Sequence, residues 1–380
     1  NKPKLMTGMT AIKFNEPTGD EKTNEGSIVK TTDTDIAWYD YDAKKWANAQ
    51  TEDGSMWVWI PRYAYKIIYN DQNDKSKGGK IDIVFLIGTT DNYYDKNGNI
   101  QTAQRQKSEE QIIETDASKT DKYTVHPAFT NESSIGYANG GWNQELAGIW
   151  VAKFEAGYAT SNGNSAPKKA SSVNYSQTSV WAQSAETGGK DGPLPARNWI
   201  DGVYGSTKTS IKYPTFQGLA YSMNYINHND AFNISRALTE NGNIYGLSRS
   251  TTDSHLMKNS EWGAVAYLTQ SSYGRNGTEV TVNSKNLQNL GTRFIYAVTG
   301  YTNKIANQVE ASSTNNMSGI FDLNGCVWER TAAYISNGNT SLSSYGQSYA
   351  NIIANENGYQ TLSTKYVTVY PYNNSGDSKT

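Results

Sequence analysis

The sequence is poor in the residues from which metal and redox sites are usually built. Its 380 residues include one cysteine and three histidines. A single cysteine excludes an intramolecular disulfide and a zinc site made of cysteines. The histidines show no HExxH or HxH spacing, so they predict no histidine metal site. We expect His126 and His228 to be surface or satisfied core residues, whereas His255 stands alone in the sequence.

Long apolar runs and an excess of one charge are also missing. No stretch of about 20 apolar residues is present, so no membrane-spanning helix is predicted. Lysine and arginine number 34 against 36 aspartates and glutamates, a formal net charge of −2. Without a basic face, binding to nucleic acid or to an anionic membrane is not expected. The opening residues, NKPKLM, contain no initiator methionine or apolar signal core, so we expect a processed product without its targeting segment.

Neutral polar and aromatic residues are abundant instead. The chain has 33 glycines, 27 tyrosines and 10 tryptophans. Its mean hydropathy is −0.69 although only 18% of its residues are charged, so asparagine, serine, threonine, glutamine and tyrosine make it hydrophilic. This composition is typical of a loop-rich protein from outside the cell rather than of a helical cytosolic enzyme.

Alternating patterns predict several strands. The segment 56–67, MWVWIPRYAYKI, places large aromatic side chains on one face and smaller apolar ones on the other. Pro61 interrupts its hydrogen bonding, which predicts an edge strand or a bulge. Further strands are predicted at 80–88 and 145–159, and hairpins at 38–49 and at the Asn97-Gly98 turn.

Two segments have apolar residues at helical spacing. The first covers 213–229 and has Pro214 near its start, where helices often have a proline. The second covers 258–274. Asn259 or Ser260 is expected to cap it, and Glu261 lies in its first turn, where the helix dipole favours an anion.

Catalytic signatures are not found in the sequence. It contains no G-x-S-x-G elbow, P-loop or dinucleotide-binding fingerprint, and no carboxylate pair stands out as a hydrolytic acid and base. Residues 91–99, DNYYDKNGN, lack the spacing and the distal glutamate of an EF-hand, so a hairpin is favoured there.

One segment combines the single cysteine with two acids: residues 319–330 read GIFDLNGCVWER. Cys326 has no activating base or cation beside it in the sequence, which favours a small buried hydrophobe over a reactive thiol. Asp322 and Glu329 can both present carboxylate oxygens, and a glycine between them lets backbone carbonyls point inwards. An all-oxygen set of this kind suits calcium. The alternative is a pair of solvated acids around a turn.

Five segments between residues 55 and 330 follow one another in the order of a known fold. They are MWVWIPRYAYKI, VHPAFT followed by GIWVAKFEAGYA, YPTFQGLAYSMNYIN, LMKNSEWGAVAYL and GIFDLNGCVWER. Together they resemble the formylglycine-generating enzyme (sulfatase-modifying factor) type of C-type lectin fold. The last is similar to the family's Gly-Leu-Tyr-Asp-Met-x-Gly-Asn-Val-Trp-Glu. The resemblance implies an α+β, C-type-lectin-like domain with few helices, antiparallel strands and long loops.

The same resemblance divides the chain into two parts. Residues 55–380 are expected to form the lectin-like domain, with insertions near 89–125 and 160–212. Residues 1–54 are expected to form a small β-rich linker or hairpin segment close to a stalk. The family's closing landmarks, an Arg-Gly-Gly strand and a terminal Gly-Phe-Arg, are not found after residue 330, so the last part of the family fold is expected to be incomplete in this chain.

In this family the loop that GIFDLNGCVWER matches binds calcium. The resemblance implies that Asp322 supplies a side-chain oxygen, Gly325 and Val327 backbone carbonyls, and Glu329 a carboxylate, to a structural calcium ion. The family's oxidases bind copper through a late pair of cysteines, and its sulfoxide synthases need an added iron-binding bundle with histidines. Neither is found here, and Cys326 stands within the calcium loop where the family usually has asparagine. We therefore expect no enzyme.

Phrases along nearly the whole chain are similar to exported proteins of Gram-positive bacteria. Examples are GMTAIKF, MWVWIPRY, KNSEWGAVAYL and YVTVY. Members of that group often begin with a pilin-like apolar segment. The resemblance implies a non-catalytic extracellular surface or filament protein that uses its lectin-like module for adhesion or self-assembly. Its partners would be a protein or glycan ligand or identical subunits. The alternatives are a phage or prophage receptor-binding or diversified tail protein and, less favoured, a copper-dependent thiol oxidase or a glycan hydrolase.

Overall fold

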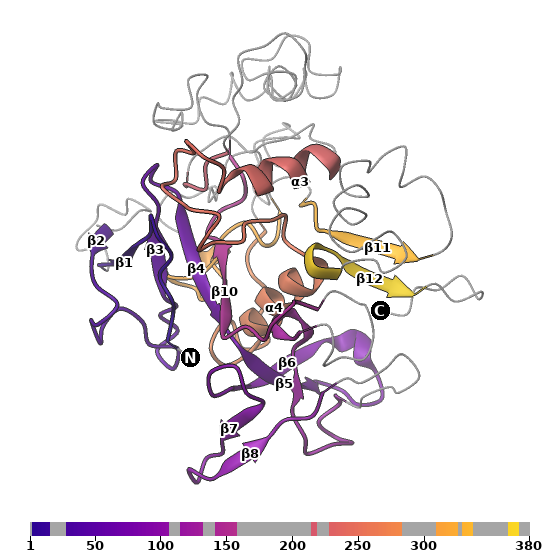
Figure 1. Cartoon of the computed structure of the whole chain (residues 1–380). Coiled ribbons are helices and arrows are strands. Elements are labelled where there is room, and N and C mark those ends of the chain that lie inside the picture. Colours follow the sequence, from indigo (N-terminus) through magenta and orange to yellow (C-terminus); the bar gives the residue numbers. More distant parts are fainter. Residues whose placement is uncertain are drawn as a thin grey trace, which may run out of the picture.

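The computed structural model describes residues 2–15, 28–105, 115–131, 141–157, 214–218, 228–282, 309–325, 329–336 and 364–371. The strands are β1 (Thr10–Phe14), β2 (Ile28–Lys30), β3 (Asn48–Gln50), β4 (Met56–Pro61), β5 (Tyr63–Tyr69), β6 (Gly79–Phe85), β7 (Asn92–Tyr94), β8 (Ile100–Thr102), β9 (Thr124–Val125), β10 (Gly148–Ala152), β11 (Ala333–Ser336) and β12 (Thr368–Pro371). The helices are α3 (His228–Ala237) and α4 (Asn259–Gln270), with short 3-10 turns η1 (Lys75–Lys77), η2 (Pro127–Phe129) and η6 (Thr364–Tyr366) (Figure 1).

Antiparallel pairing dominates the fold. The largest sheet has the order β10-β4-β3-β1-β2, and every neighbouring pair in it is antiparallel. A second sheet has the order β6-β5-β9, and β7 and β8 form a separate hairpin. Only β11 and β12, among the described strands, pair in parallel. With two α-helices in the described residues, this is a sheet-rich α+β fold, as the sequence predicts.

The chain passes from one sheet to the other at Arg62. β4 ends at Pro61 and β5 begins at Tyr63, so the predicted break is confirmed. The predicted edge position is wrong, because β4 lies between β10 and β3 and all six of its residues are buried. Pro61 is the last residue of β4, so its missing N–H removes no hydrogen bond from the middle of the strand.

The main core lies where β4, the second sheet and α4 meet. Its buried side chains come from all three and include Val58, Ile60, Tyr63, Ile83, Phe129, Val265 and Leu268. The hydroxyl of Tyr63 donates to the carbonyl of Ala264 on α4 (2.7 Å). α4 also packs against β6 and η2, so one helix joins the two sheets.

The residues before position 55 contribute to the large sheet. β1, β2 and β3 extend it beyond β4, and Trp38 and Trp46 are buried in it. The expected domain boundary at 54 therefore falls in the connection between β3 and β4, which pair with each other. Of the two expected insertions, 89–125 contains β7 and β8, and 160–212 lies outside the described residues.

Several local predictions are confirmed. Asp40 and Lys45 exchange backbone hydrogen bonds (2.8 and 2.7 Å) in the predicted hairpin. Gly98 has a φ of +81°, as the predicted tight turn requires. The strands predicted at 80–88 and 145–159 correspond to β6 and β10.

The helix predictions have different outcomes. α4 confirms the helix predicted at 258–274, but Lys258 rather than Asn259 or Ser260 is its N-cap. The Glu261 side chain accepts a hydrogen bond from the backbone N–H of Lys258 (2.8 Å), so this acid satisfies one of the unpaired donors at the helix start. In the described part of the chain, no helix has the length and apolar composition needed to cross a membrane.

The start of the helix predicted at 213–229 is wrong. Residues 214–218 are not helical, and Thr215 forms an isolated bridge with Gly157. Phe216 accepts a backbone hydrogen bond from Met56 (2.9 Å), and its ring lies 4.8 Å from that of Trp57. Pairing with distant strands thus outweighs the local helical pattern. α3 begins only at residue 228, and 219–227 lie outside the described residues.

Candidate functional site

Three of the four predicted calcium ligands belong to the described part of the chain. These are Asp322, Gly325 and Glu329, whereas Val327 and the neighbouring Cys326 lie outside it. Asp322 is 1% exposed and has a φ of +64°, a left-handed conformation that is uncommon for a residue with a side chain. Gly325 has a φ of +102°, which favours glycine. The backbone between the two thus turns sharply, and it leads from the buried Asp322 to the exposed Gly325.

The glycine that opens this segment is required by close packing. A Cβ on Gly319 would lie 2.6 Å from the hydroxyls of Ser313 and Thr314, and closer still to that of Ser312. These three residues are fully or almost fully buried. Two hydrogen bonds of 2.9 Å join Ser313 to Ile320. The N–H of Ser313 donates to the carbonyl of Ile320, and the N–H of Ile320 donates to the hydroxyl of Ser313. Any side chain at position 319 would therefore displace these hydroxyls or the backbone that leads into the turn.

Glu329 lies beside the start of α4. Its Oε2 accepts a hydrogen bond from Nε1 of Trp262 (2.6 Å). Loss of solvent around the carboxyl group, together with the negative charge of Asp322, raises the pKa of Glu329 to about 7. The residue taken as a whole is exposed to solvent. The negative charge of Asp322 thus opposes the ionisation of Glu329.

This donor set fits calcium better than a transition metal. The described residues contain no group of three or more His, Cys, Asp or Glu side chains that could hold a metal ion. A cation here would therefore depend on backbone carbonyls as well as on Asp322 and Glu329, and calcium accepts such mixed oxygen ligands in irregular geometry. Asp322 also accepts a weak hydrogen bond from the N–H of Glu155 (3.4 Å), which joins the turn to the chain following β10.

Sequence reasoning missed the polar cluster at the start of α4. His255, which stands alone in the sequence, pairs with Glu261 (Nε2 to Oε2, 3.0 Å). The ammonium of Lys258 is buried 3.5 Å from the centre of the Trp142 ring, and burial lowers its pKa to about 8. Asp253 pairs with Arg236 on α3 and with another cation, Lys365. Only the spacing of His255 and Glu261 could have indicated any of this.

His126 is a satisfied core histidine, as predicted. It is 4% exposed and lies among aromatic rings, including those of Tyr63, Tyr65 and Phe129. Its Nδ1 accepts the N–H of Ala128 (3.3 Å) and so caps η2. Burial lowers the pKa of His126 to about 3, and the ring is therefore neutral at physiological pH. The side chain of His228 lies outside those that the structure describes.

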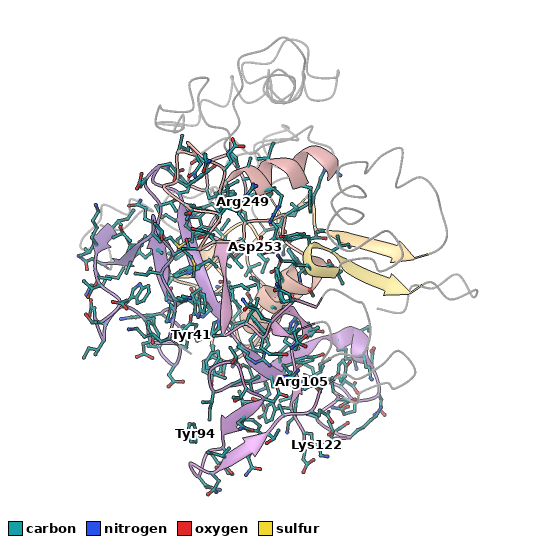
Figure 2. All side chains as sticks on the ribbon, viewed as in Figure 1. Tyr41, Tyr94, Arg105, Lys122, Arg249 and Asp253 are labelled. Atoms are coloured by element: carbon teal, nitrogen blue, oxygen red, sulfur yellow. The ribbon has the colours of Figure 1, made fainter. Side chains whose placement is uncertain are left out.

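The β7–β8 hairpin exposes two apolar side chains side by side. Tyr94 and Ile100 are opposite each other in the register, and each is 60% exposed. Their neighbour Tyr93 points inward and is 9% exposed in a separate small core. The hairpin lies at one end of the molecule, with Tyr94 at its outer side (Figures 1 and 2). The hairpin thus carries one exposed apolar pair next to the polar pair Asn92 and Thr102.

A group of four charges fixes the base of this hairpin. Asp91 immediately precedes β7, and Arg105 follows β8. The buried guanidinium of Arg62 pairs with Asp91 (2.8 Å) and Glu145 (2.7 Å). Arg105 pairs with the same two acids (2.5 and 2.9 Å). Each acid therefore lies between two arginines, and Arg62 also donates from Nε to the carbonyl of Thr90 (3.0 Å). Arg105 is labelled in Figure 2.

Comparisons of the chain with protein-family models, with curated proteins and with solved structures found no match.

Proposed function

We propose that this protein is a non-catalytic extracellular module of the C-type-lectin-like, formylglycine-generating-enzyme type, displayed on a bacterial surface or in a filament. It acts in adhesion or self-assembly, and its partner is a protein, a glycan or another copy of the chain. The sequence resemblances motivate this proposal, and the sheet-rich α+β architecture is compatible with it.

The exposed face of the β7–β8 hairpin is the observation that carries the proposal. Tyrosine provides a large contact area at small entropic cost. Tyr94 and Ile100 form one apolar pair across two strands, whereas isolated exposed hydrophobic residues need no explanation. The paired charges of Arg62, Asp91, Arg105 and Glu145 hold the base of the hairpin, so the contact surface is already ordered before a partner binds.

A structural calcium ion in the 322–329 turn is the second part of the proposal. Asp322 and Glu329 supply carboxylates, and Gly325 and Val327 supply backbone carbonyls. Two features support it: Asp322 is buried in a left-handed backbone conformation, and its negative charge repels that of Glu329. A bound dication would offset the cost of burying the Asp322 carboxylate and the cost of this repulsion. The ion would fix the turn and take no part in a reaction.

The proposed contact surface is tested with the double variant Tyr94→Ser, Ile100→Thr. Its sedimentation profile and its binding to a glycan array and to whole Gram-positive cells are compared with those of the unaltered protein. We expect at least about tenfold weaker binding or self-association, because residues central to an interface dominate its energy.

The matched control is Ile36→Thr, which removes an apolar side chain that is 98% exposed in another part of the chain. It should leave every profile unchanged. The contact role of the hairpin is refuted if the double variant keeps its fold, measured by circular dichroism, and binds or self-associates as the unaltered protein does.

A further inference from the structure

Lys153 is held away from water just after β10, and burial lowers the pKa of its side-chain amino group well below the usual range. Its side chain is completely buried. The rings of Phe14, Phe321 and Phe154 surround its ammonium, with centres 4.6, 5.3 and 5.9 Å away. Burial of a charge among apolar rings is strongly unfavourable unless hydrogen bonds replace the lost water. The residues that supply those bonds therefore show what this lysine holds in place.

Three neutral oxygens surround the ammonium. Nζ donates to Oδ1 of Asn48 (2.9 Å), to the carbonyl of Gly319 (2.8 Å) and to the carbonyl of Met317. In its charged form the lysine side chain has three N–H donors, one for each of these acceptors. The amide of Asn48 in turn donates to the carbonyl of Ser318 (2.7 Å). Three successive carbonyls, at 317, 318 and 319, are thus held by two side chains, one on β3 and one just after β10.

The segment held in this way leads directly into the calcium-type turn. The N–H of Phe321 donates to the carbonyl of Lys153 (2.8 Å), and the N–H of Glu155 donates to Oδ2 of Asp322 (3.4 Å). Asp322 is three residues beyond Gly319, where a Cβ would collide with the hydroxyls of Ser313 and Thr314. The same stretch, 153–155, therefore holds both the entrance of the turn and its first carboxylate.

We propose that Lys153 is a positioning residue for the calcium turn: its side-chain nitrogen holds the carbonyls of Met317 and Gly319, so that the carboxylate of Asp322 is already in place when the cation binds. This inference rests on the calcium part of the proposed function. Lys153 is not a ligand, and its effect passes through the backbone. Residues that orient metal ligands in this way reduce the conformational freedom that binding would otherwise have to remove.

Calcium affinity of the variant Lys153→Met tests the inference. Methionine keeps most of the apolar stem but has no N–H donor. Calorimetric titration with calcium chloride should show an affinity about 10- to 100-fold weaker than that of the unaltered protein. The control is Arg62→Met, which removes another fully buried cation, in a different network; it should bind calcium with unchanged affinity where the protein is folded.

The outcomes separate the two proposals. If the unaltered protein binds calcium and Lys153→Met binds it equally well, the positioning role is refuted and the calcium site stands. If the unaltered protein binds no calcium, the calcium site is refuted, and the inference fails with it.

A second measurement does not depend on the folding of any variant. Hydrogen exchange of the unaltered protein is followed with and without calcium. We expect calcium to slow exchange at the N–H groups of Phe321 and Lys153 as well as in the turn itself, because these groups belong to one hydrogen-bonded unit. If calcium slows exchange only in the turn from Asp322 onwards, and not at Phe321 and Lys153, the inference is overturned.

Discussion

The charge group at the base of the β7–β8 hairpin gives the sharpest energetic prediction. Replacing Arg62 by methionine removes a guanidinium that is 0% exposed and that pairs with Asp91 and Glu145. It also leaves the carbonyls of Thr90 and Phe129, to which Arg62 donates at 3.0 and 2.7 Å, without that donor. We therefore expect a large loss of stability.

The magnitude follows from what remains in the site. Removing one partner of a buried ion pair typically costs about 3–5 kcal/mol, because the other charge stays buried. Arg105 still neutralises part of the charge on the two acids, and each unpaired carbonyl adds about 1–3 kcal/mol unless it relaxes. For Arg62→Met we expect a loss of about 4 kcal/mol in the free energy of unfolding.

Arg105→Met is the matched comparison. Arg105 pairs with the same acids, but its side chain is 19% exposed and Arg62 remains with both acids after its loss. We expect this variant to cost about 1 kcal/mol, as for pairs near the surface. Guanidinium unfolding midpoints at unchanged slope give both values. The reasoning is refuted if Arg62→Met is no more destabilising than Arg105→Met.

Three further predictions concern the pH dependence, the packing and the metal. Because burial lowers the folded pKa of His126 to about 3 from 6.5, its contribution to stability is complete above pH 6.5 and is lost as pH falls towards 3. The free energy of unfolding, measured with denaturant at pH 7 and at pH 4.5, should therefore fall by about 3 kcal/mol more in the unaltered protein than in His126→Asn. Gly319→Ala should destabilise by about 1–3 kcal/mol or more in the same melts, whereas Gly263→Ala within α4, whose Cβ would lie no closer than 3.8 Å to His126, should stabilise by up to about 1 kcal/mol. Calcium should raise the melting temperature of the unaltered protein, and a chelator should reverse the rise; Glu329→Gln should abolish it, and an equal rise in that variant would remove Glu329 from the ligand set.

Local chemistry was enough to predict much of the secondary structure. The alternation in 56–67 predicts a strand that is interrupted at Pro61, because side chains on a strand point to opposite faces and proline lacks an N–H. The Asn97-Gly98 pair predicts its turn because glycine accepts a positive φ. Glu261 is expected in the first turn of a helix because the helix dipole favours an anion there. Each of these predictions depends only on residues a few positions apart.

Tertiary structure decided the rest, because the partners are far apart in the sequence. Residues 214–218 have a helical pattern, yet their backbone is extended because it bonds to the segments near Met56 and Gly157. Lys153 resembles any strand lysine until the fold brings Asn48 and residues 317–319 to its ammonium. Arg62 and Arg105 become the base of a hairpin only once Glu145 lies between them. A buried charge is stable only where several distant groups meet around it, and no local pattern records that meeting.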